Sequence, residues 1–144
     1  MKVVIIGGIH HNTLGVVRSI GSAGISSKDI ALFIVDEHGE KKDFVSKSKY
    51  LKRSTIRYLK TYDEMLEALC KIANKNEKKA IICCADGASE VVMSNADNLK
   101  EFFFCSSIGV QPDSFFNKND QSLGTCPETI LVYNAGSCHS SSGT

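Results

Sequence analysis

The sequence predicts an α/β fold with an open, mostly parallel sheet of about four to five strands and helices on both faces. Three observations lead to this prediction. Short apolar runs alternate along the chain with stretches whose apolar residues recur at helical spacing. The apolar runs are continuous, which is typical of strands buried on both faces. The first run ends in Gly-Gly directly before a helical stretch, as in the β-α-β unit of a parallel sheet.

The first strand and helix are predicted by a change of period. Residues 2–7, KVVIIG, are mainly β-branched and form the first predicted strand. From Thr13 the apolar and small residues, among them Leu14, Val17 and Gly21, fall on one helical stripe. The chain therefore begins as strand, loop and helix.

The second strand is predicted at residues 29–36, DIALFIVD, and ends at Asp36. Residues 37–56 are charged and aperiodic, so we expect a long connection there. A second long helix begins at Thr61, where TYDE fits the capping box T-x-x-E, and apolar residues follow at helical spacing as far as Ala73.

The remaining elements repeat the alternation. Residues 80–86, AIICCAD, predict a third strand, and residues 87–101 a helix or a broken helix. Residues 102–108, FFFCSSI, predict the fourth strand.

The pattern weakens near residue 110. Beyond it lies one more apolar run, TILVY at residues 129–133, and the chain closes in a Ser/Gly-rich tail. A length of 144 residues suits one compact core. We expect an α/β domain at residues 1–110, followed at 111–144 by the start of a linker or a poorly ordered tail.

The overall charge argues against a polyanionic partner. Seventeen Lys and Arg residues against sixteen Asp and Glu residues leave a formal charge of +1, which does not favour nucleic acid or an acidic membrane surface. The first apolar run is far shorter than a signal peptide's apolar region or the ~20 residues that span a bilayer. We therefore expect a cytoplasmic protein with no nucleic-acid or membrane partner.

The six cysteines do not form a metal or redox motif. Four of them lie in apolar runs, which indicates buried reduced thiols. Cys83 and Cys84 are adjacent, so on a strand their side chains point to opposite faces. The spacing of Cys126, Cys138 and His139 matches no zinc pattern. We therefore expect no metal site.

The loop after the first strand, GGIHHNTLG, is the first candidate ligand site, because ligands of parallel sheets gather at the carboxyl ends of the strands. It lacks both G-x-G-x-x-G and G-x-x-x-x-G-K-[ST]. A helix start near Asn12 or Thr13 remains, whose N–H groups suit an anion or carboxylate. In the alternative interpretation Asn12 or Thr13 caps the helix. We expect a sharp bend at Gly7 and Gly8, because glycine tolerates unusual backbone angles.

Four more candidates are charged or ionisable. His10 and His11 are adjacent, so we expect a solvent-facing pair, with ligand contact by one of them as the alternative. Asp36 could bind a ribose hydroxyl or serve as a turn residue. Asp86 ends a strand before a helix, and either caps that helix or contacts ligand. The candidate ligand-binding residues are Gly8, His10, His11, Asn12, Thr13, Asp36 and Asp86; none is assigned a catalytic role.

The basic run KSKYLKR at residues 47–53 is a weaker candidate. It could meet phosphate, but a run of like charges is more often a solvated face.

Three segments together resemble the N-terminal, Rossmann-like pre-ATP-grasp domain of ATP-grasp proteins of the carbamoyl-phosphate-synthase-like type. They are VVIIGGIHHNTLGVVRSIGSAGI, SKSKYLKR and IICCADGASEVVMSNADNLKEFF. The resemblance covers about residues 1–110 and rests on the order and spacing of these segments. NKNDQ and CPET look like the family's entry into its ATP-binding part, but Lys118 and Pro127 are closer together than is usual there.

The resemblance implies the front domain of a carboxylate-amine/thiol ligase with a small carboxylate substrate. ATP and magnesium are implied for the full-length family, whose nucleotide-clamping residues have no counterpart in this chain. The missing ATP-grasp domains, or a subunit carrying them, are the implied partner, and we also weigh a homodimer. This chain alone should not turn over ATP. The alternatives are a free-standing α/β module that binds a small anion or nucleotide, and a structural piece that docks on a partner.

Overall fold

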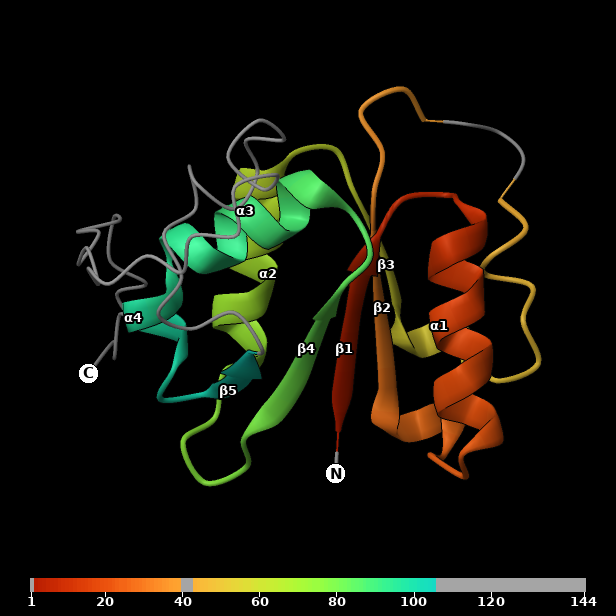
Figure 1. Cartoon of the computed structure of the whole chain (residues 1–144), viewed down its shortest axis with the longest axis horizontal. Helices are drawn as coiled ribbons and strands as arrows, with labels where there is room; N and C mark the ends of the chain where they lie inside the picture. The colour runs from red at the N-terminus through yellow and green to blue at the C-terminus, as the bar shows by residue number, and fades with distance from the viewer. Residues whose placement is uncertain (1, 40–42, 106–144) are drawn as a thin grey trace, which may run out of the picture.

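The central strand of the structure is β1, Val3–Gly7, in a five-stranded sheet of order β3-β2-β1-β4-β5. This computed structural model describes residues 2–39 and 43–105. All four strand pairs are parallel, which confirms the predicted open α/β sheet (Figure 1). The other strands are β2 (Ile30–Val35), β3 (Ile56–Leu59), β4 (Lys79–Cys83) and β5 (Phe103–Cys105).

Helices cover both faces of the sheet (Figure 1). On one face lies α1 (His11–Ser22), and on the other lie α2 (Tyr62–Ile72), α3 (Asp86–Ser94) and α4 (Ala96–Leu99). The strand order and the two helical layers make the fold Rossmann-like.

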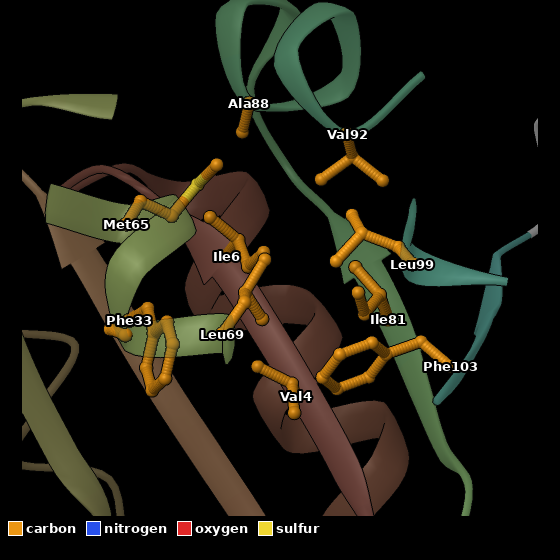
Figure 2. Close-up of a cluster of buried hydrophobic side chains, with 11 residues drawn as sticks. Val4, Ile6, Phe33, Met65, Leu69, Ile81, Ala88, Val92, Leu99 and Phe103 are labelled. Atoms are coloured by element: carbon orange, nitrogen blue, oxygen red, sulfur yellow. The ribbon is translucent and has the colours of Figure 1, made fainter. Parts of the chain in front are cut away.

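Alternate residues of β1 serve two separate cores. Val3 and Ile5 pack in the core on the α1 side, whereas Val4 and Ile6 pack in the core under α2 and α3 (Figure 2). All four side chains are at most 4% exposed. Each such burial is worth about 1.5–3 kcal/mol. β1 therefore joins the two layers, as expected of a strand covered on both faces.

Strand β3 is the element that the sequence does not predict. It begins at Ile56, the last residue of the stretch predicted as a long connection, and pairs with residues Leu32 to Val35 of β2. Arg57 and Tyr58 in the middle of β3 are exposed, and the strand has only four residues. A short strand at the sheet edge shows no continuous apolar run, which is why its signal is weak. The apolar run at 129–133 and the tail at 111–144 lie outside the described residues.

The structure confirms two predictions about helices, the capping box at the start of α2 and the broken helix at residues 87–101. The Thr61 hydroxyl accepts the N–H of Glu64 at 3.2 Å, and the Glu64 carboxylate accepts the N–H of Lys60 at 2.7 Å. The capping box therefore starts α2. The broken helix is also confirmed, because α3 and α4 are separated at Asn95, whose side chain donates to the Val91 carbonyl at 2.8 Å.

The described part of the connection between β2 and β3 is held to β3 by Asp43 and to α1 by Tyr50. Asp43 accepts the N–H groups of Val45 and Ser46 and the hydroxyl of Tyr58. Burial raises the pKa of Asp43, but these hydrogen bonds outweigh it and hold that pKa below its ordinary value. Further along, the Tyr50 ring lies directly against Gly21 of α1, where any Cβ would collide with it.

We predict that Gly21→Ala destabilises the protein, because the Tyr50 ring must move away from α1. Overpacking of this kind costs about 1–3 kcal/mol. Gly15→Ala is the matched control in the same helix: a Cβ there meets nothing within 4 Å, and alanine should add up to about 1 kcal/mol of helix stability. Urea unfolding of both variants measures the effect. Equal midpoints for the two variants would contradict the contact.

The free cysteines of the described chain, Cys83, Cys84 and Cys105, lie at the ends of β4 and β5. Burial raises the pKa of the Cys83 thiol to about 12, against a small lowering by a hydrogen bond with Ser89. Burial likewise raises that of Cys105 to about 11. These thiols are therefore neutral at physiological pH. Cys70 of α2 is disulfide-bonded, so the expectation of a reduced thiol is wrong for it.

We predict that Cys83 and Cys105 resist iodoacetamide at pH 8 in the folded protein and react readily in urea, because the thiolate is the nucleophile. Peptide mapping by mass spectrometry reads the labelling. The raised pKa values also act on stability. Above pH 9 the unfolded chain loses these protons, while the folded chain keeps that of Cys105 up to about pH 11 and that of Cys83 up to about pH 12, so stability falls as the pH rises through that range. For the labelling experiment, equal rates at Cys83 and Cys105 with and without urea would contradict the burial of these thiols.

Candidate functional site

The carboxyl edge of the sheet carries the loops after β1, β2 and β4. Strands β1 and β4 are neighbours, and the chain leaves them toward opposite faces, from β1 into α1 and from β4 into α3 (Figure 1). The point at which the connections diverge in this way is the topological switch point of a doubly wound sheet. Ligands of such folds bind beside it.

Gly7 allows α1 to approach the sheet at this point. A Cβ at Gly7 would lie 2.5 Å from the Thr13 Oγ1 and 2.9 Å from the Cys84 Cβ, so only glycine fits. A Cβ at Gly8 would meet only the ring of His10 at 2.9 Å, with the next atom at 3.8 Å. Positive φ angles occur at two other glycines of the described chain and at neither of these. The expectation about unusual backbone angles is therefore wrong: space, not conformation, requires Gly7.

Helix α1 begins at His11, one or two residues earlier than the sequence predicts. The N-cap is His10, whose side chain makes no capping hydrogen bond. Neither Asn12 nor Thr13 caps the helix, because both lie within its first turn. Asn12 is exposed, and Thr13 is fully buried and packs against Gly7. The N–H groups of the first turn of α1 consequently have no side-chain cap, which is the arrangement that suits an anionic ligand group.

Helix α3 has the same feature on the other side of the switch point. Its N-cap is Ala85, and no side chain caps it. Asp86 is the first helical residue rather than the cap, so the capping interpretation of Asp86 is wrong. Its exposed carboxylate lies in the first turn, where the helix dipole favours negative charge. Of the three long helices that start at this edge, α2 alone has a side-chain cap.

A hollow of about 250 Å³, which we name the edge hollow, lies over the ends of β1 and β2. It brings together three of the predicted site residues, Gly8, His10 and Asp36. Asp36 also accepts the backbone N–H of His38 at 3.0 Å, so it acts as a turn residue as well. The lining residues are Gly8, Ile9, His10, Val35, Asp36, Glu37, His38 and Tyr62.

Tyr62 is a residue of the site that the sequence does not predict. It is the first residue of α2 and lines the edge hollow. A Cβ at Gly87 would lie 2.5 Å from its Oη, so the ring extends from the hollow to the start of α3. Burial raises the pKa of Tyr62, and the negative charges of Glu37 and Asp86 raise it further. The TYDE capping box was the available signal, since it places Tyr62 at the first turn of a helix at this edge.

The remaining candidates lie outside the edge hollow. His11 is exposed, and its ring centroid is 5.0 Å from that of Phe44, so it turns toward the β2–β3 connection. Asn12 and Thr13 belong to the first turn of α1 without lining the hollow. The carboxyl edge therefore carries His10, Asp36 and Asp86 around Tyr62, with His11 directed away.

The described residues contain no group of three or more His, Cys, Asp or Glu side chains that could hold a metal ion. Within the same ranges, no helix has the length and apolar character needed to cross a membrane. Cys126, Cys138 and His139 lie outside the described residues.

Comparison of the chain with protein-family models, with curated proteins and with solved structures finds no match. The function must therefore be argued from the fold and from this edge of the sheet.

Proposed function

We propose that the chain is the Rossmann-like, substrate-side front domain of an ATP-grasp carboxylate-amine/thiol ligase and that it binds a small carboxylate substrate at the edge hollow. The observation that carries the proposal is the uncapped first turn of α1 beside that hollow. Its backbone N–H groups and the positive end of the helix dipole suit a carboxylate.

The charges around the edge hollow favour a substrate that also carries an amino group. Asp36 and Glu37 line the hollow, and Asp86 lies close enough to raise the pKa of Tyr62. These carboxylates attract an ammonium group and repel a polyphosphate. A small amino acid satisfies both requirements, with its carboxylate at α1 and its ammonium group toward Asp36 and Glu37.

The described residues do not fit ATP or Mg²⁺ as ligands of the edge hollow. The loop after β1 has no phosphate-binding glycine motif, and no metal-ligating cluster occurs among the described residues. Under this proposal the ATP-binding domains, in the same polypeptide or in a partner subunit, hold the nucleotide and the magnesium ions. The residues of this chain bind and orient the carboxylate that is to be activated.

We predict that a small amino acid shifts the backbone amide signals of residues 11–14 and 36–38 in a heteronuclear NMR titration. The probes are the twenty proteinogenic amino acids, with succinate and glutarate as acids that lack the amino group and should bind more weakly. Gly8→Val should abolish the shifts, because its side chain enters the loop that lines the hollow. His11→Ala is the matched control and should retain them. If no probe shifts these signals, or if the shifts are lost equally in Gly8→Val and His11→Ala, the edge hollow is not the binding site.

A second experiment tests the family assignment separately. We predict one of two outcomes for the protein isolated from its native source. Either its mass exceeds 15.7 kDa, or it copurifies with a subunit that releases ADP from MgATP when a carboxylate substrate is added. Intact-mass spectrometry and an ADP-release assay read the two outcomes. A 15.7 kDa protein with no ATP-consuming partner would refute the ligase and favour the free-standing binding module.

A further inference from the structure

A second hollow lies on the flank of α1 and shares no residue with the edge hollow. Its volume is about 500 Å³, within the range of small-molecule sites. The C-terminal half of α1 forms one wall, and the connection from β2 to β3 forms the other. We name it the basic hollow; its lining residues are Arg18, Ser19, Ser22, Lys47, Ser48, Lys49 and Tyr50.

The wall opposite α1 is held in place by packing and by turns. Val45 is fully buried in the core on the α1 side. The Ser48 N–H donates to the Val45 carbonyl, and the Leu51 N–H donates to the Ser48 carbonyl, each at 3.1 Å. Tyr50 lies against Gly21 of α1. The backbone that carries the lysines of this wall is therefore fixed opposite α1.

Three cations line the basic hollow without a carboxylate to neutralise them. Arg18 comes from α1, whereas Lys47 and Lys49 come from the opposite wall. No acidic residue lines the hollow, and none of the three forms a salt bridge within the described chain. The Lys49 Nζ lies 5.1 Å from the centroid of the Tyr50 ring. The three cationic side chains are exposed and repel one another across the hollow, so a bound anion would relieve their repulsion.

We propose that the basic hollow binds a small phosphate-bearing ligand with at least two negative charges, such as a phosphate monoester or a pyrophosphate. Arg18 offers a planar fork of donors to phosphate oxygens, while Lys47 and Lys49 act as point charges. Ser19 and Ser48 also line the hollow, and their hydroxyls add neutral hydrogen-bonding groups.

The size and limits of the basic hollow favour a small ligand over a nucleic acid or a membrane. Two of the four basic residues in the run at 47–53 line the hollow, whereas Lys52 and Arg53 do not. The whole chain carries a formal charge of only +1. Long polyanions need an extended basic surface, which a concave site with three cations does not provide.

The test is a titration of the intact chain with pyrophosphate and with inorganic phosphate, and in parallel with a DNA oligonucleotide and with vesicles containing anionic lipid. Calorimetry and NMR at low and physiological salt measure the binding. The site variant is Arg18→Gln/Lys47→Gln/Lys49→Gln. The matched control removes the same charge from three exposed lysines outside the hollow: Lys28→Gln/Lys52→Gln/Lys60→Gln. We expect wild-type binding to weaken about tenfold or more in the site variant, since charge-assisted contacts are lost, and to stay unchanged in the control.

Thermal unfolding verifies that both triple variants fold. If the site variant does not fold, the single substitution Lys47→Glu at an exposed residue replaces it, and pyrophosphate binding should weaken in the same way. Three results would overturn the proposal. One is no pyrophosphate binding by the wild-type chain. Another is equal weakening in both triple variants, which would show a general effect of charge. The third is binding confined to a DNA oligonucleotide or to vesicles containing anionic lipid.

Discussion

The alternation of β1 between two cores is the constraint on which the rest of the structure depends. Val3 and Ile5 face α1, Val4 and Ile6 face α2 and α3, and β2 and β4 pair with the strand on its two sides. Burial on both faces requires helices in both layers, and right-handed crossovers from parallel strands supply them. The switch point follows from the same arrangement, because the chain must leave β1 toward one face and β4 toward the other.

The end of β1 links this packing to the proposed function. Since Gly7 has no side chain, Thr13 can pack against it, which brings the start of α1 close to the sheet. Thr13 is then committed to the interior and does not cap the helix. The first-turn N–H groups of α1 therefore lie beside the edge hollow without a side-chain acceptor. The need for glycine at position 7 and the missing side-chain cap of α1 therefore have the same origin, the close packing of Thr13 against β1.

The layers and most elements of the fold follow from local patterns, whereas the site depends on contacts between distant segments. Continuous apolar runs predict β1, β2, β4 and β5, and the capping box at Thr61 predicts the start of α2. Strand β3 is not predicted, because exposed Arg57 and Tyr58 interrupt its apolar pattern at the sheet edge. Tyr62 is not predicted as a site residue for another reason: its neighbours in the edge hollow come from other elements. The sequence does indicate Lys47 and Lys49 of the basic run, but spacing along one segment carries no information about Arg18, which lies opposite them on α1.

Native-state hydrogen exchange tests the central role of β1 most directly. If β1 joins both layers, its amides can exchange only when the whole domain unfolds, so their exchange free energies should equal the global unfolding free energy measured in urea. The edge strands β3 and β5 pair on one side each within the described sheet and should open at lower free energy. Exchange of the β1 amides at a free energy equal to or below that of β3 would contradict the account.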